Sequence, residues 1–151
     1  MTPEGALEEI YNFRWCAPDL ASAGQPRAAE FALVAQAGFE VVVNLALLDA
    51  DYSVPDECEL VRALGMEFIH IPVIWEAPAP QDFQRFCAAM QRCQGRKIFL
   101  HCAANMRVSA FLALYRILEL GWPRAAALAE VEAIWHPNPQ WQAFIDSHLA
   151  F

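Results

Sequence analysis

Three continuous apolar segments, each placed just after a glycine that ends a helical pattern, constrain the fold of this chain more than any other feature. The segments are Glu40–Leu45, Glu67–Ile71 and Lys97–His101, and the glycines are Gly38, Gly65 and Gly95. Strands that are apolar on both faces and alternate with helices are typical of a parallel sheet covered by helices on both sides. We therefore expect a three-layer α/β fold with a central, mainly parallel sheet of about four to five strands.

Helical periodicity occupies most of the remaining chain. The pattern over Val108–Leu120 is apolar on nearly all sides, which predicts a buried central helix. Before Pro26 the pattern predicts only a short helix over Ala6–Tyr11, followed by an edge strand. The other expected helices are Arg27–Ala37, Pro55–Leu64, Pro80–Cys93, Arg124–Trp135 and Trp141–Leu149.

Length and composition predict one domain over residues 1–151. The chain has 57% hydrophobic and 19% charged residues, enough apolar material for a well-packed core. No apolar run approaches membrane-spanning length, and the amino terminus lacks a secretory leader, which predicts a cytoplasmic protein without a membrane partner. The net charge of −8 argues against a nucleic-acid partner, because phosphate backbones are bound by clustered Lys and Arg. The sequence leaves the oligomeric state open.

Cysteine and histidine spacing indicates neither disulfides nor a metal site. The five cysteines form no C-x-x-C pair and the four histidines show no ligand spacing, so reduced thiols and no metal are expected. The acidic residues from Asp49 to Glu59 predict a solvated loop and helix face. Four cysteines in apolar, periodic settings are predicted to pack in the core: Cys16, Cys58, Cys87 and Cys93.

Cys102 has a different setting, because it directly follows a predicted buried strand and precedes a loop of small residues and a helix. Ligands of open α/β sheets bind beyond the carboxyl ends of the strands, where Cys102 is expected. Free N–H groups and the dipole at a helix start favour a bound anion and a thiolate. With Arg107 close by, the segment predicts an anion site with a nucleophile. Asn44 ends a strand at the same edge and either braces the loop or forms a turn.

The segment His101–Ser109 resembles the signature loop of the cysteine-dependent phosphatases, the protein-tyrosine and dual-specificity superfamily. Weaker similarity covers roughly Leu20–Leu120 and favours a bacterial branch of small phosphatase-like domains. The resemblance implies a phosphoric monoester hydrolase without metal or organic cofactor, acting on a phosphorylated protein or a small phosphate ester. The supporting motifs are Ser22-Ala23-Gly24-Gln25-Pro26, Ile71-Pro72-Val73 and Pro78-Ala79-Pro80-Gln81-Asp82-Phe83, with the Gly38–Leu45 turn and strand.

The resemblance also implies a role for each site residue. Cys102 would attack phosphorus to form a cysteinyl-phosphate, and Arg107 would clamp two phosphoryl oxygens. Ser109 would hydrogen bond the leaving thiolate in the second step. His101 would orient the loop and help to keep the thiol ionised. The phosphate-binding residues would be Ala103, Ala104, Asn105, Met106 and Arg107.

The position of the arginine departs from the family pattern. In most of the superfamily five residues separate cysteine and arginine, and Ser or Thr follows the arginine directly. Here four residues separate Cys102 from Arg107, and Val108 precedes Ser109. One helical position is about 100° of rotation, enough to displace a guanidinium unless the loop compensates.

The general acid is the second departure. Related domains commonly carry an aspartate directly after the Ile-Pro-Val motif, where this chain has Ile74. Glu76 is the predicted substitute, and Asp82 is the alternative, although its position also suits the N-terminal cap of a helix. Without an acid, aryl phosphates would react and alkyl esters would react slowly.

Two other functions remain open from the sequence. Ile74 and the displaced Arg107 favour a catalytically weak pseudophosphatase that binds phosphate. The short interval between Cys102 and Arg107 also suits rhodanese-like sulfurtransferases, which share the strand, cysteine loop and helix but use a shorter loop.

Overall fold

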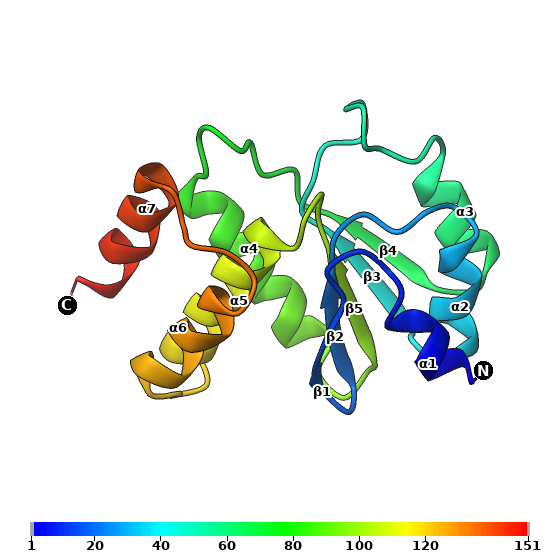
Figure 1. Cartoon of the computed structure of the whole chain (residues 1–151), viewed down its shortest axis with the longest axis horizontal. Coiled ribbons are helices and arrows are strands. Elements are labelled where there is room, and N and C mark those ends of the chain that lie inside the picture. The colour runs from blue at the N-terminus through cyan, green and yellow to red at the C-terminus, as the bar shows by residue number, and fades with distance from the viewer. Residues whose placement is uncertain (1, 151) are drawn as a thin grey trace.

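The computed structural model describes residues 2–150, in which five strands form one sheet (Figure 1). The strands are β1 (Arg14–Ala17), β2 (Leu20–Ala23), β3 (Val41–Asn44), β4 (Glu67–His70) and β5 (Ile98–His101). Their spatial order is β1-β2-β5-β3-β4, with β1 antiparallel to β2 and every other pair parallel. The central position therefore belongs to β5, the strand that leads into Cys102.

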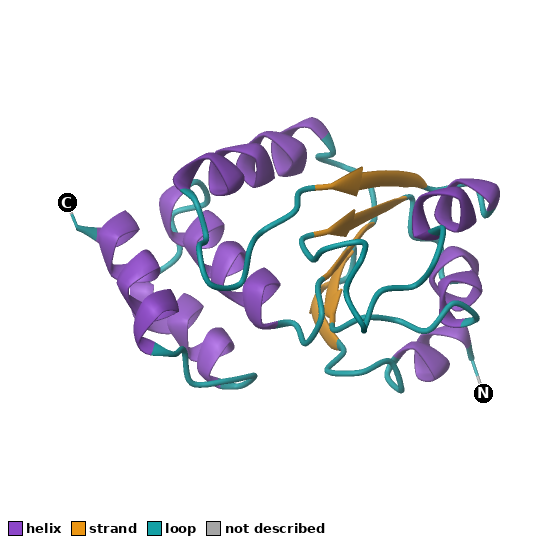
Figure 2. Cartoon of the chain, turned by 90° about the horizontal axis from the view of Figure 1, so that it is seen from above, coloured by secondary structure: helices purple, strands orange, loops and turns teal. Residues whose placement is uncertain are grey.

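Helices cover both faces of the sheet (Figures 1 and 2). One face carries α1 (Pro3–Leu7), α2 (Glu30–Gln36) and α3 (Glu57–Ala63), and on the other side lie α4 (Pro80–Arg92), α5 (Met106–Leu118), α6 (Arg124–Glu132) and α7 (Pro139–Leu149). Each side has its own apolar core, which includes Phe31 and Phe99 on the first side and Leu100 and Phe111 on the second. The three-layer, mainly parallel α/β fold is confirmed.

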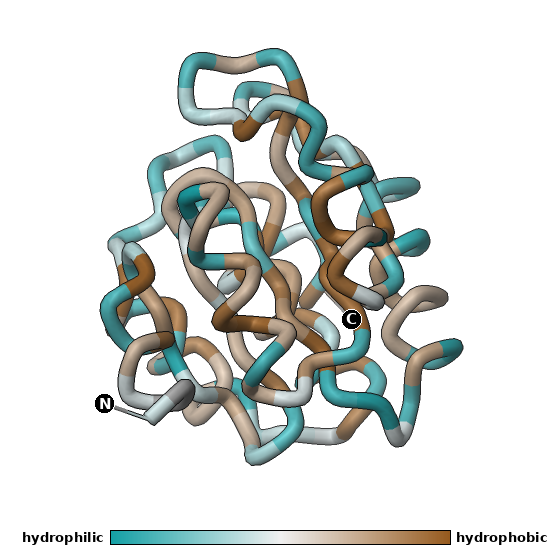
Figure 3. Tube along the Cα trace, turned by 90° about the vertical axis from the view of Figure 1, so that its right-hand side faces the viewer, coloured by the Kyte–Doolittle hydropathy of each residue, from teal (hydrophilic) through white to brown (hydrophobic). Residues whose placement is uncertain are grey.

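Hydropathy follows this layering. Apolar stretches dominate the interior of the trace, whereas hydrophilic stretches gather in the peripheral turns (Figure 3). No helix within residues 2–150 combines the length and apolar character required to cross a bilayer.

Helix α5 is the buried central helix that its composition predicts. Every residue from Arg107 to Arg116 is buried, because α5 packs against the sheet and contacts α4, α6 and α7. Polar side chains on α5 therefore lie inside the protein, and Arg107 and Ser109 are among them.

The largest differences from the expected elements lie in the amino-terminal third. Helix α1 begins at Pro3 because the Thr2 hydroxyl caps it by accepting a hydrogen bond from the Gly5 N–H, at 3.1 Å. The single expected edge strand is a hairpin of β1 and β2. Helix α2 begins at Glu30, not Arg27, because the preceding residues form a tighter turn, in which the Glu30 N–H donates to the Arg27 carbonyl at 2.9 Å and the Glu30 carboxylate accepts the Arg27 N–H at 2.8 Å.

Candidate active site

Cys102 lies at the carboxyl end of β5, between the ends of β2 and β3, and a loop of residues 103–105 leads from it to the start of α5. Its residue exposure is 1%, and it contributes to the wall of a pocket of about 180 Å³. The pocket lies at the edge where ligands are expected in this class of fold. Its lining residues are Trp75, Cys102, Ala103, Ala104, Met106 and Arg107.

The loop after Cys102 presents backbone donors that the fold leaves unpaired. Within residues 2–150, the N–H groups of Ala103 and Ala104, and of the first three residues of α5, have no protein acceptor. The dipole of α5, a helix of 13 residues, adds partial positive charge at the same place. Together these donors form a site suited to an anion with several acceptor oxygens.

Asn105 shapes this loop. It adopts the left-handed conformation with φ of 65°, which Asn tolerates better than other residues that carry a Cβ. Its side-chain Nδ2 donates to the Asn12 carbonyl at 2.9 Å and to Ser22 Oγ at 3.0 Å. Asn12 in turn donates to the Ala104 carbonyl at 3.0 Å. The turn before α5 is therefore fixed from outside by the amino-terminal segment.

The segment Ser22–Pro26 braces the loop from the neighbouring strand. The Gln25 N–H donates to the Ala103 carbonyl at 2.9 Å. A Cβ on Gly24 would lie 2.7 Å from the Ala103 carbonyl oxygen and 2.7 Å from Tyr11 Cδ2, closer than real Cβ contacts allow. Glycine is thus required where β2 meets the loop. The motif noted in the sequence for family resemblance has a structural function.

His101 belongs to a buried polar network. Its Nε2 lies 2.7 Å from Glu57 Oε2, and its Nδ1 lies 3.2 Å from the Cys102 carbonyl oxygen. Glu57 also accepts hydrogen bonds from Asn44 Nδ2 at 3.0 Å and from Gln25 Nε2 at 2.9 Å. Burial raises the pKa of the Glu57 carboxyl. The hydrogen bond and the charge of His101, and the hydrogen bonds of Gln25 and Asn44, outweigh burial and hold this pKa below its ordinary value.

This network corrects one prediction and resolves another. Glu57 is 3% exposed, so it does not belong to a solvated helix face. The α3 helix turns it inward, toward His101, and sequence spacing gave no signal for this contact. Asn44 has the turn-forming role, because its Oδ1 accepts the Ala46 N–H at 2.7 Å; its Nδ2 donates to Glu57 and not to the Cys102 loop.

Arg107 is held by the loops that follow β3 and β4. Its Nη1 donates to the Val73 carbonyl at 2.7 Å and its Nη2 to the Tyr52 hydroxyl at 3.3 Å. The guanidinium carbon lies 5.9 Å from the Tyr52 ring centroid and 5.8 Å from that of Trp75. The arginine that the sequence places one position early is thus fixed at the pocket wall. Sequence reasoning missed Tyr52, whose one signal is its place after a strand at the same sheet edge.

Neither candidate acid is part of the pocket wall. Glu76 is exposed. Its backbone carbonyl accepts a hydrogen bond from Gln140 Nε2. Asp82 is the third residue of α4, where its carboxylate accepts the Ala79 N–H at 3.2 Å. Asp82 therefore caps the helix, from inside its first turn. Ile74 is 51% exposed.

Ser109 bonds to the first turn of α5 and to Trp135. Its Oγ donates to the Met106 carbonyl at 2.8 Å and accepts the Trp135 indole N–H at 3.0 Å. Trp135 contacts Trp75 and Trp141 in an aromatic cluster behind the loop. Its predicted assistance to the leaving thiolate stays a prediction.

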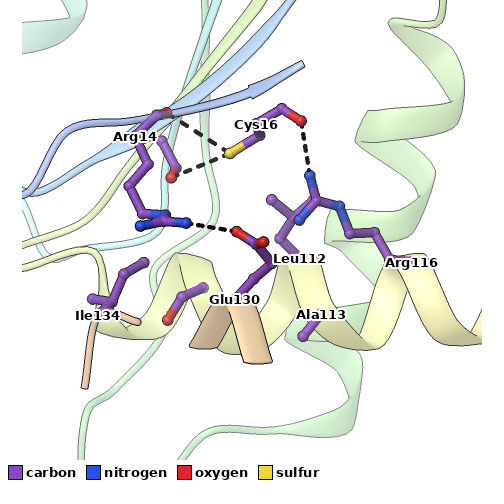
Figure 4. A pocket seen from close by; sticks show the side chains of 9 residues that line it. Arg14, Cys16, Leu112, Ala113, Arg116, Glu130 and Ile134 are labelled. Carbon is purple, nitrogen blue, oxygen red and sulfur yellow. Dashed lines mark hydrogen bonds and ion pairs between the residues drawn. The ribbon is translucent and has the colours of Figure 1, made fainter. Parts of the chain in front are cut away.

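The other cysteines pack in or against the apolar cores, as predicted. Cys16 borders a second hollow of about 10 Å³, hardly more than one water, between β1, α5 and α6 (Figure 4). There Arg116 donates to the Cys16 carbonyl at 3.2 Å, and Arg14 pairs with Glu130 at 2.7 Å.

Burial, together with the charge of Glu119, raises the pKa of the Cys87 thiol to about 11, so Cys87 is protonated at neutral pH.

Comparison with known proteins agrees with this geometry. A family model described as a DSP-PTPase phosphatase fused to NAD+ kinase matches residues 19–135. The chain belongs to this DSP-PTPase family. Beta-lactamase hydrolase-like proteins of two Xylella fastidiosa strains are 28% identical over 122 residues, which cover 79% of this chain. The chain spans 27% of the length of these curated relatives.

Solved structures show the same fold as this DSP-PTPase chain. A DUF442 protein from Shewanella putrefaciens CN-32 is 35% identical, with a TM-score of 0.86, and the match covers 97% of this chain and 96% of that protein. Tk-PTP is 19% identical with a TM-score of 0.76, over 91% of this chain and 95% of its own. TpbA of P. aeruginosa is 20% identical, with a TM-score of 0.73, and the match covers 91% of this chain and 84% of TpbA. The last two likenesses concern the fold alone.

Proposed function

We propose that this chain hydrolyses phosphoric monoesters through a cysteinyl-phosphate intermediate, as a phosphatase of the protein-tyrosine or dual-specificity type. The Cys102 thiolate attacks phosphorus, the S–P bond forms, and the bond to the leaving oxygen breaks. Water then cleaves the S–P bond and releases phosphate. The substrate is a phosphorylated protein or a small phosphate ester.

One observation carries the proposal. Cys102 shares a pocket with unpaired backbone donors and a fixed guanidinium, so a phosphoryl group bound by them would meet the sulfur. Charge that spreads over the phosphoryl oxygens in the transition state would be stabilised by groups already in place. Arg107 presents a planar fork that suits two oxygens at once.

A second function, phosphate binding without efficient turnover, is supported by a different observation. None of the described residues lining the pocket is an aspartate or glutamate. A pseudophosphatase of this kind would bind a phosphorylated partner and release it unchanged. Sulfur transfer receives no comparable support from the pocket.

Hydrolysis of an aryl phosphate by wild type and Cys102→Ser protein separates these functions. We expect Cys102→Ser to abolish turnover while phosphate still binds, because the loop donors and Arg107 remain. Cys87→Ser is the matched control, since Cys87 is a half-buried thiol on α4, and it should keep full activity. Equal turnover by Cys102→Ser and wild type contradicts the proposal. Tight phosphate binding by a wild-type protein without turnover favours the binding function.

A further inference from the structure

A phosphatase acting at this pocket needs a proton donor for basic leaving groups, and none of the described residues that line the pocket is an aspartate or glutamate. Alkoxide and simple phenoxide leaving groups require protonation as the bond to phosphorus breaks. Ile74 replaces the expected aspartate, the exposed Glu76 carboxylate has no partner within residues 2–150 that fixes its position, and the Asp82 carboxylate is committed to the start of α4. A donor therefore has to come from another element at the same sheet edge.

The Tyr52 hydroxyl meets this requirement. Its oxygen accepts the Leu47 N–H at 3.1 Å and Arg107 Nη2–H at 3.3 Å. A phenol has two acceptor lone pairs and one proton, so both lone pairs are used and the proton remains. Within residues 2–150 that proton has no protein acceptor. Tyr52 is not itself among the residues that line the pocket, but its hydroxyl lies one hydrogen bond away from Arg107, which lines the pocket and would hold the phosphoryl group.

The loop after β3 holds Tyr52 in this position. The Ser53 hydroxyl donates to the Leu47 carbonyl at 2.8 Å and accepts the Ala50 N–H at 3.0 Å, which closes the loop on itself. The Tyr52 ring packs against the core cluster that contains Cys102 and faces the Arg107 guanidinium. Because both the ring and the hydroxyl oxygen of Tyr52 have fixed contacts, the side chain needs little reorganisation to donate its proton.

We infer that Tyr52 is the general acid of this site and donates its hydroxyl proton to the leaving oxygen of the substrate. The inference rests on the phosphatase function proposed above. As the S–P bond forms and the P–O bond breaks, the proton moves from Tyr52 to the departing oxygen. The phenolate that remains keeps two donors, the Leu47 N–H and Arg107. In the second step it removes a proton from the attacking water, which restores the phenol as phosphate leaves.

The test compares two substrates with the Tyr52→Phe variant. Phenyl phosphate has a basic leaving group that needs a proton, whereas dinitrophenyl phosphate has one that leaves without it. We expect kcat/KM for phenyl phosphate to fall about 100-fold or more, and that for dinitrophenyl phosphate by less than about fivefold. Tyr115→Phe is the matched control, because Tyr115 is a buried tyrosine of α5 and its loss should not distinguish the substrates. Thermal melting and phosphate binding report whether each variant folds and binds.

Other outcomes overturn the inference. An equal loss for both substrates means that Tyr52 only positions Arg107, and no loss means that it does neither. A substrate-dependent loss in Glu76→Gln with none in Tyr52→Phe assigns the proton to Glu76. These results leave the phosphatase function standing, whereas a wild-type protein that hydrolyses neither substrate contradicts the proposed function as well.

Discussion

His101 has an acceptor at each ring nitrogen, and Glu57 is the acceptor that carries charge. The Nδ1 contact with the Cys102 carbonyl joins this ring to the start of the Cys102 loop. Three donors converge on the two Glu57 oxygens, so a neutral amide at this position would turn its own N–H₂ toward another donor. The charge of Glu57 therefore matters more than its shape.

We predict that Glu57→Gln lowers the free energy of unfolding by about 2 kcal/mol at neutral pH. Because the fold lowers the pKa of Glu57, its stabilising contribution is complete above the ordinary value of 4.5 and is lost as the pH falls through the lower folded value. The difference between variant and wild type should shrink below about pH 4.5. Urea unfolding at a series of pH values measures it. Glu59→Gln, at an exposed position of the same helix, should change little. A difference that grows toward acid pH contradicts this account.

Contacts between single residues were the part of the site hardest to predict. The nucleophile, the arginine and the loop amides lie in one short segment, so local sequence could place them together. Tyr52 and Glu57 reach the site from the loop and helix after β3, and their partners lie 55 and 44 residues away. No periodicity links such pairs, because the contacts depend on how a loop folds back over the sheet edge.

The end of β2 packs closely against the Cys102 loop. The backbone of Gly24 lies so close to the Ala103 carbonyl and Tyr11 that a methyl group has no room. The loop that should bind phosphate is thus shaped by a strand far away in sequence, and a change in β2 is expected to reach the site.

We predict that Gly24→Ala weakens phosphate binding and lowers the free energy of unfolding by about 1–3 kcal/mol, because the loop must move to accommodate the methyl group. Gly95→Ala is a suitable control, since its φ of +83° makes alanine strained there while nothing lies within 4 Å of the new Cβ. The control should lose stability and keep its phosphate affinity. Calorimetric titration with phosphate measures both variants, and equal affinities would show that β2 does not shape the loop.

The sequence predicted strands well where a short apolar run follows a glycine, both for the fully buried β3 and β5 and for the partly buried β4. Strands β3, β4 and β5 are short and apolar, and each follows a glycine, so their positions agree with expectation to within a residue or two. The hairpin of β1 and β2 was harder to recognise, because Arg14–Ala17 is only half-buried and shows no alternation. Helix α7 begins at Pro139 because Asn138 accepts the Trp141 N–H and caps it.

For the whole molecule, the alternation of strands and helices predicted a mainly parallel α/β sheet. That class of fold in turn predicted a site at the carboxyl ends of the strands. The net charge of −8 gives no general attraction for an anion, so binding must depend on the local donors and Arg107. The geometry of that arginine could not be predicted, because it depends on the Val73 carbonyl and on Tyr52 and Trp75 from two separate loops.

The most direct test of the central claim is to detect the cysteinyl-phosphate itself. Protein mixed with an excess of an aryl phosphate, quenched in acid and digested, should yield a phosphorylated peptide that contains Cys102 when analysed by mass spectrometry. The same treatment of Cys102→Ser should leave that peptide unmodified. Turnover of the substrate by the wild type with no phosphate on Cys102, or with phosphate on another residue, would contradict the account.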